Sequence, residues 1–205
     1  MTISLSDAGK RYNRDWIFRH IDYTFQPGQS YAITGPNGSG KSTLLQVLSG
    51  AMMLNEGTIQ FSLNNIQCSI EKIYQQVSIC APYLEVVEEM TLHEFLDFHH
   101  GFKPFLEGIT NDEIVKSVGL EKAISKQIRY YSSGMKQRVK LAQCIFSDTS
   151  IVLLDEPCTN LDTTGIDLYH SLIEDYCKDR LVVVSSNDEV EFRFCKTRLN
   201  ISDYK

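Results

Sequence analysis

A glycine-rich loop at residues 35–43, GPNGSGKST, constrains the possible fold of this chain more than any other segment. The loop satisfies the pattern G-x-x-x-x-G-K-[ST], in which glycines let successive backbone N–H groups point inward at phosphate oxygens. The apolar segment SYAIT precedes it. The segment STLLQVLSGAM follows, with apolar side chains at helical spacing at Leu44, Leu45, Leu48 and Met52. This context favours a strand, a phosphate-binding loop and a buried helix over an ordinary glycine-rich turn.

The loop supplies candidate ligands for a nucleotide phosphate and for its metal ion. Lys41 would reach the β- and γ-phosphates, and the hydroxyl group of Ser42 would bind Mg²⁺. The helix that begins near Lys41 would add the positive end of its dipole. The candidate nucleotide-binding residues of the loop are Gly35, Pro36, Asn37, Gly38, Ser39, Gly40, Lys41, Ser42 and Thr43.

Two short, wholly apolar runs at 151–154 and 181–184 predict parallel strands buried on both faces of a sheet. Asp155 directly follows the first run, so its carboxylate would be held rigidly enough to meet Mg²⁺, directly or through water. Glu156 could orient and deprotonate an attacking water. The alternative is that both acids only cap the next helix, and the glycine loop makes that reading the weaker one.

The pattern of the chain divides it into regions. The first sixty residues alternate polar and apolar positions in short runs that read as strands joined by turns. From about Thr91 to Phe146 the pattern becomes helical, and capping boxes at 91–94 (TLHE) and 110–113 (TNDE) mark helix starts. We therefore expect one α/β domain over 1–205.

Within that domain, residues 1–82 and 148–205 would form a P-loop core with a mainly parallel sheet and a small antiparallel β part. Residues 83–147 would form a helical lobe. Four phenylalanines of this lobe would pack in its core. They are Phe95, Phe98, Phe102 and Phe105.

Composition excludes several other classes of protein. A net charge of −6 argues against general nucleic-acid binding through a basic surface. The six cysteines include no CxxC pair, so neither a structural zinc site nor a redox motif is visible, and we expect reduced, buried thiols. The amino terminus has no apolar signal segment, and no run approaches about 18 consecutive apolar residues. We therefore expect a cytoplasmic chain.

The stretch RYYSSGMKQRVKLAQCIF at 129–146 resembles the signature of the ATP-binding cassette (ABC) family, roughly Leu-Ser-Gly-Gly-Gln before a helix. It matches at Ser132 and Gly134, whereas Ser133 replaces a glycine and Met135 replaces the glutamine. The segments EGTI and DEPCTNLD also look like cassette segments and occur in the right order. The resemblance covers essentially the whole chain.

This resemblance implies an ABC ATPase fold and a head-to-tail pair of cassettes, either a homodimer or a pair of different chains. The signature residues Ser132, Ser133 and Gly134 would then offer donors to a nucleotide held by the partner's loop. Asp162 would couple the two sites, or it would only cap a helix. Tyr12 occupies the place of an aromatic residue that stacks on adenine, with Trp16 nearby as an alternative.

Two polar residues expected from the family pattern are absent. The glutamine that senses Mg²⁺ and the attacking water falls on Pro82; Gln75 and Gln76 lie upstream, before the strand, and Glu85 is a possible substitute. The histidine that contacts the γ-phosphate falls on Asn187, which can donate a hydrogen bond but carries no charge. We therefore predict tight binding of Mg-ATP with slow turnover.

The function that these features favour is the ATP-binding and ATP-hydrolysing subunit of an ABC transporter, which dimerises on Mg-ATP and drives a separate membrane permease. It would lie in the cytoplasm, on the inner face of the cell membrane. Its catalytic residues would be Glu156, Lys41 and Asn187, and no nucleic-acid partner is expected. The alternatives are a soluble cassette ATPase, a slowly hydrolysing regulatory module and, more weakly, a P-loop kinase.

Overall fold

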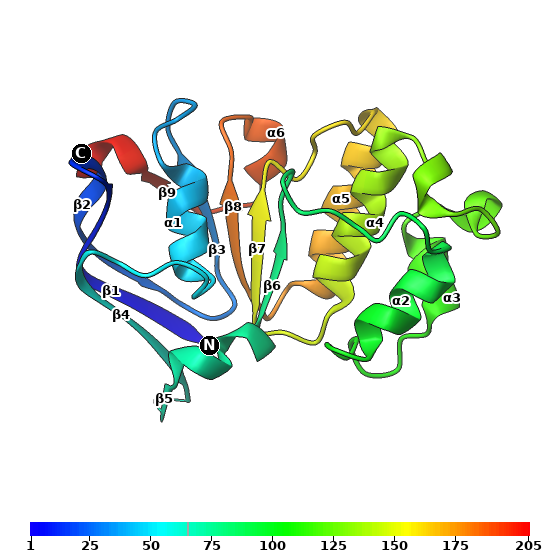
Figure 1. Cartoon of the computed structure of the whole chain (residues 1–205), viewed down its shortest axis with the longest axis horizontal. Helices are drawn as coiled ribbons and strands as arrows, with labels where there is room; N and C mark the ends of the chain where they lie inside the picture. Colours follow the sequence, from blue (N-terminus) through cyan, green and yellow to red (C-terminus); the bar gives the residue numbers. More distant parts are fainter. Residues whose placement is uncertain (65) are drawn as a thin grey trace. The chain divides into compact units, whose positions relative to one another are not determined.

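The computed structural model describes residues 1–64 and 66–205, and Figure 1 draws its helices and strands. The chain forms two compact units, each assembled from separate parts of the sequence. The first unit comprises Met1–Ile79, Thr149–Asp155 and Asp179–Lys205, and the second comprises Cys80–Asp148 and Glu156–Lys178.

An antiparallel sheet with the strand order β2-β1-β4-β5 makes up the first part of the first unit. Its long strands β1 (Thr2–Tyr12) and β2 (Asp15–Phe25) form a hairpin, and β4 (Glu56–Leu63) pairs with the other edge of β1. These three strands confirm the expectation that the alternating pattern of the first sixty residues forms strands. The short strand β5 (Ile66–Cys68) was not anticipated from the sequence.

A second sheet in this unit has the strand order β6-β7-β8-β3-β9. Its strands are β6 (Val77–Cys80), β7 (Ile151–Asp155), β8 (Leu181–Ser185), β3 (Ser30–Thr34) and β9 (Thr197–Asn200). The pairs β7–β8, β8–β3 and β3–β9 are parallel, and every residue of β7 and β8 is buried. The two apolar runs therefore form the central parallel strands that the sequence predicted.

Helix α1 (Lys41–Leu48) begins where the glycine loop ends and packs its apolar side against β7 and β8. The expectation that Met52 lies on this helix was wrong. The helix ends at Leu48, and Gly50 follows in a left-handed conformation (φ 77°) that turns the chain away. Met52 nevertheless packs against the core of this unit, which explains its apolar character.

The remaining elements of the first unit are short. They are the 3₁₀ turns η1 (Ile70–Gln75) and η4 (Ile201–Tyr204) and the helix α6 (Glu189–Phe192).

The second unit is helical. It contains α2 (Leu92–His100), α3 (Asn111–Ser117), α4 (Ser133–Phe146), α5 (Thr163–Tyr176) and the 3₁₀ turns η2 (Glu121–Ala123) and η3 (Ile128–Tyr130). Both predicted capping boxes are present, with Thr91 capping α2 and Thr110 capping α3. Helix α5 groups with this unit because it packs on α4, with the rings of Phe146 and Tyr176 4.6 Å apart. The sequence-based division instead placed all of 148–205 with the core.

The four phenylalanines of the helical region have two different environments. Phe95 and Phe105 are buried, whereas Phe98 and Phe102 are 46% and 76% exposed and lie edge to face with centroids 5.0 Å apart. Among residues 1–64 and 66–205, no helix combines the length and the apolar character that crossing a membrane requires. Among the described residues, none of the six cysteines forms a disulfide; Cys68 and Cys158 are partly exposed, and the others are buried as expected.

Candidate functional site

The glycine loop between β3 and α1 depends on glycine at two places where the backbone is crowded. Gly35 has a φ of 141°, and a Cβ there would lie 2.8 Å from Ser39 Oγ and 2.9 Å from the side chain of Ile201. Gly40 has a φ of 108°, and a Cβ there would lie 2.2 Å from Ile17 Cγ2. Both the positive φ and the close contacts exclude other residues, so the loop can wrap tightly.

Two buried polar groups line this loop. Lys41 is 6% exposed, and its Nζ donates to the carbonyl oxygens of Gly35 at 2.8 Å and Pro36 at 3.4 Å. The Oγ of Ser39 is buried and has no hydrogen-bond partner among the described residues. A buried hydroxyl without a partner is costly, and a bound anion at this loop would supply an acceptor.

The amino terminus of α1 is open to an anion as well. No side chain caps it, because the N-cap residue is Gly40, and no acidic residue lies in its first turn. The first N–H groups of a helix have no partner within the helix and attract negative charge. The loop thus has the shape, donors and charge that suit a phosphate group.

Asn187 reaches this loop from the segment that follows β8. Its Oδ1 accepts a hydrogen bond from the backbone N–H of Gly35 at 3.1 Å, and its Nδ2 donates to Asn37 Oδ1 at 3.2 Å. The structure therefore brings Asn187 together with the loop, although 152 positions separate it from Gly35. Through these two bonds Asn187 contacts the first and third residues of the loop.

Asp155 ends β7 and is 3% exposed, and its Oδ1 accepts a hydrogen bond of 2.6 Å from Ser185 Oγ. Ser185 was missed by the sequence reasoning, although its place at the end of the second apolar run was the available signal. Ser42 lies partly buried in the first turn of α1. Carboxylate and hydroxyl oxygens are hard donors of the kind Mg²⁺ prefers, so these two residues fit that ion chemically.

Glu156 follows Asp155 directly and begins the part of the second unit that leads to α5. Its φ of 44° is unusual for a residue other than glycine, and its side chain is exposed. Its carbonyl oxygen accepts a hydrogen bond of 3.1 Å from the N–H of Thr159, which closes a turn. The turn presents the Glu156 side chain to solvent.

The signature segment forms the beginning of α4. Ser132 is its N-cap residue, with Oγ accepting a hydrogen bond of 3.2 Å from the N–H of Met135. A Cβ on Gly134 would lie 2.8 Å from the carbonyl oxygen of Asn160, so this glycine is required for close packing. Ser132 and Ser133 are exposed, as donors for a ligand need to be.

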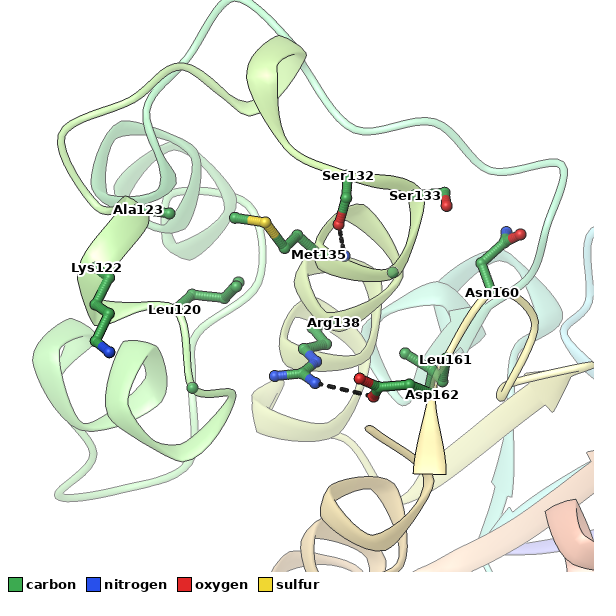
Figure 2. A pocket seen from close by; sticks show the side chains of 12 residues that line it. Leu120, Lys122, Ala123, Ser132, Ser133, Met135, Arg138, Asn160, Leu161 and Asp162 are labelled. Atoms are coloured by element: carbon green, nitrogen blue, oxygen red, sulfur yellow. Dashed lines mark hydrogen bonds and ion pairs between the residues drawn. The ribbon is translucent and has the colours of Figure 1, made fainter. Parts of the chain in front are cut away.

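A cavity of about 460 Å³ opens beside this helix start in the second unit, as Figure 2 shows. Its wall includes Lys122 from the segment facing α4. Arg138 on α4 forms an ion pair of 3.4 Å with Asp162 (Figure 2). Asp162 also caps α5, because its Oδ1 accepts a hydrogen bond of 2.8 Å from the N–H of Gly165. The helix-cap role considered for Asp162 is therefore present.

Tyr12 lies at the end of β1 with 46% of its surface exposed, and its hydroxyl group donates to Met52 Sδ at 3.3 Å. The ring of Trp16 is only partly exposed, with the guanidinium group of Arg19 4.5 Å and that of Arg11 5.3 Å from its centre. The ammonium group of Lys10 lies 5.6 Å from the centre of the Tyr12 ring, so both rings carry a nearby cation, and Tyr12 is the more exposed of the two residues.

The three candidate substitutes for the glutamine that the family pattern expects differ in their positions and contacts. Gln75 ends η1 and Gln76 follows it, so both precede β6, as predicted. The side chain of Gln76 accepts a hydrogen bond of 2.8 Å from Ser150 Oγ. In the second unit, the carbonyl oxygen of Pro82 accepts one of 3.0 Å from Lys140 Nζ, and Glu85 is exposed.

Comparisons with known proteins agree with this geometry. The family model described as "ABC transporter" matches residues 18–159. The uncharacterised ABC transporter ATP-binding protein YhcH of Bacillus subtilis (strain 168) is 30% identical over 193 residues, or 90% of this chain and 61% of that protein. The uncharacterised ABC transporter ATP-binding protein YybJ of the same organism is 30% identical over 192 residues, which cover 90% of this chain and 85% of that protein.

Among solved structures, one described as a dimeric, post-hydrolysis state of the ATP-binding cassette MJ0796, bound to ADP and Pi, shares the fold. It superposes with a TM-score of 0.82 at 21% identity, covering 97% of this chain and 94% of that one. The chain therefore spans most of that cassette, but only about three fifths of YhcH.

Proposed function

Since this chain belongs to the ABC transporter family as an ATP-binding subunit, we propose that it binds and hydrolyses Mg-ATP and dimerises to drive a separate membrane permease. The glycine loop carries this proposal. Three of its features together suit a triphosphate: Lys41 points inward, the buried Ser39 hydroxyl group has no hydrogen-bond partner in the part of the chain that the structure describes, and the glycines are crowded.

The proposed chemistry assigns a role to each group around the loop. The backbone N–H groups of 35–43 and the Lys41 ammonium group bind the β- and γ-phosphates. Ser42 and Asp155 hold Mg²⁺, which neutralises charge on the phosphate oxygens when bound. The hydrogen bond from Ser185 orients the Asp155 carboxylate. Glu156 takes a proton from the attacking water at its carboxylate.

The dimer would place Ser132, Ser133 and Gly134 of one copy over the nucleotide of the other. The exposed start of α4 supports this, since its N-terminal end favours an anion. So does the MJ0796 structure, which is a dimer bound to ADP and Pi. We propose that Tyr12 stacks on adenine and that Asp162, beside its capping role, takes part in contacts between the two copies.

The proposed partner is an integral membrane permease, which would hold the chain at the inner face of the cell membrane, on the cytoplasmic side. The names of the relatives YhcH and YybJ support a transporter context. The adjoining exposed rings of Phe98 and Phe102 support a docking surface on the helical unit, since contiguous exposed apolar surface is a feature of protein interaction sites.

We expect the purified chain to bind Mg-ATP in isothermal titration calorimetry and to bind more weakly after EDTA removes the metal, because Mg²⁺ screens the triphosphate charge. We also expect it to copurify from membranes with a protein that has several apolar spans. Absence of binding to any nucleoside triphosphate in magnesium-containing buffer would refute the proposal. Cosedimentation with ribosomes or DNA would instead favour a soluble cassette ATPase.

We further propose that turnover is slow because Asn187 and Pro82 replace groups that act on the γ-phosphate side. The Asn187 amide cannot carry charge or relay a proton, whereas an imidazole can. Asn187→His should therefore raise the steady-state rate of phosphate release by about tenfold or more. Asn187→Ala, which also loses the bond to Gly35, should give no increase.

Rapid hydrolysis by the purified wild-type chain alone would contradict the slow-turnover proposal. Phosphate release that stays absent even with the permease present would instead favour a regulatory nucleotide-binding module.

A further inference from the structure

We propose that Gln137 is a positioning residue for hydrolysis: its amide group holds the chain segment that carries Glu156 and ties that segment to α4. The inference rests on the proposed ATPase function and deepens it, because it names a residue that acts through Glu156. Gln137 lies in the second turn of α4 and is 3% exposed.

The contacts of the Gln137 amide explain why a polar side chain is buried here. Its Nε2 donates a short hydrogen bond of 2.7 Å to the carbonyl oxygen of Pro157 and makes a longer contact of 3.7 Å with Cys80 Sγ. Pro157 is the residue directly after Glu156 and is itself buried. A hydrogen bond in such low-dielectric surroundings is strong, and its loss leaves a carbonyl group without its donor.

The backbone at Glu156 needs this kind of support. Its φ of 44° lies in the left-handed region, which non-glycine residues occupy only when their surroundings hold them there. On its carboxyl-terminal side, the turn is closed by the bond from the Thr159 N–H to the Glu156 carbonyl oxygen. The bond from Gln137 fixes the intervening carbonyl, so it limits how far the Glu156 side chain can swing.

Two other contacts join the same segment to the first turns of α4. The carbonyl oxygen of Asn160 lies so close to Gly134 that a Cβ there would be 2.8 Å away. Arg138 and Asp162 form an ion pair of 3.4 Å, visible in Figure 2, but its carboxylate partner is 74% exposed, and exposed pairs are weak. Among these contacts the Gln137 bond is the buried, short and donor-specific one.

The arrangement has a mechanical consequence. Residues 132–135 line the cavity at the start of α4, and Gln137 lies within one turn of them on the same helix. If a ligand displaced the start of α4, the buried hydrogen bond from Gln137 to Pro157 would therefore displace the segment that carries Glu156. A displacement of about 1 Å at a catalytic group can cost about a hundredfold in rate.

The first test replaces Gln137 with methionine, which keeps the length of the side chain but removes the donor. We expect kcat to fall by about tenfold to a hundredfold, while the Kd for Mg-ATP stays within about twofold of wild type. Gln143→Met is the matched control, because Gln143 is on the same helix and its side chain makes no hydrogen bond to the described residues. Its kcat should stay within about twofold of wild type.

The second test asks whether Gln137 acts through Glu156. Single-turnover hydrolysis of radiolabelled ATP is compared for wild type, Gln137→Met, Glu156→Gln and the double variant. In a Glu156→Gln background, Gln137→Met should have no further effect, since residues that act as a unit are not additive. The melting temperature of each variant, measured with and without Mg-ATP, checks that the variant is folded and binds nucleotide.

Two results would overturn the inference. One is an equal fractional loss of rate from Gln137→Met with and without Glu156, which would mean that Gln137 acts elsewhere. The other is a kcat that is unchanged in Gln137→Met, so that the substitution alters only the affinity for ATP or only the melting temperature. Failure of the proposed function looks different, because the wild-type chain itself would then not bind Mg-ATP.

Discussion

Lys41→Ala is expected to lower the affinity of the chain for Mg-ATP by about a hundredfold or more and to bring phosphate release to background. The Lys41 ammonium group is buried and points back over the loop, to the carbonyl oxygens of Gly35 and Pro36. Charge-assisted hydrogen bonds to phosphate contribute about 1.5–3 kcal/mol each, and no backbone group of the loop can replace a full positive charge. Equilibrium binding of a fluorescent ATP analogue measures the effect.

Lys72→Ala is the control for this variant, because Lys72 is an exposed lysine on η1 and its removal changes the net charge equally. Its affinity should match wild type within about twofold. Affinity for Mg-ATP that is the same in Lys41→Ala and Lys72→Ala would show that the loop does not hold the triphosphate.

Glu156→Gln is expected to retain ATP binding but to lose hydrolysis by about a hundredfold or more, since general-base catalysis contributes about 10²–10⁴ in rate. The amide keeps the size of the side chain but cannot take the proton of the attacking water. The ATP-bound pair of cassettes should then persist. Size-exclusion chromatography with Mg-ATP should show a dimer for this variant, and phosphate release gives the rate.

The matched control is Glu174→Gln, an exposed glutamate on α5 that undergoes the same chemical change. Its rate and elution should match wild type. A Glu156→Gln chain that elutes as a monomer at saturating Mg-ATP would argue against the trapped dimer, and an undiminished rate would remove Glu156 from its proposed role.

Local sequence pattern accounts for much of the fold. The capping boxes at Thr91 and Thr110 involve residues three positions apart, so the helix starts could be read without knowledge of packing. The apolar runs of β7 and β8 follow from the same logic, because strands that are covered on both faces of a sheet have that composition. Apolar spacing extended the helix after the loop to Met52, whereas the helix ends at Leu48 and the left-handed Gly50 turns the chain away.

Resemblance to a family located the signature segment and the position of Asn187, but it said nothing about which atoms meet. Tertiary structure supplied the bond from Gly35 to Asn187 and the bond from Ser185 to Asp155, which join residues 152 and 30 positions apart. It also grouped α5 with the helical unit, a boundary that local pattern placed elsewhere.

The sequence by itself determined the pattern of the glycine loop, the parallel strands and the helix starts, because each depends on residues within a few positions of one another. Only the tertiary structure decided which carbonyl group accepts from the Gln137 amide and which side chain accepts from the Gly35 N–H. It also left the buried Ser39 hydroxyl group without a hydrogen-bond partner among the described residues. Those contacts depend on how distant segments pack, and the free energy of packing is a property of the whole core rather than of any short stretch of sequence.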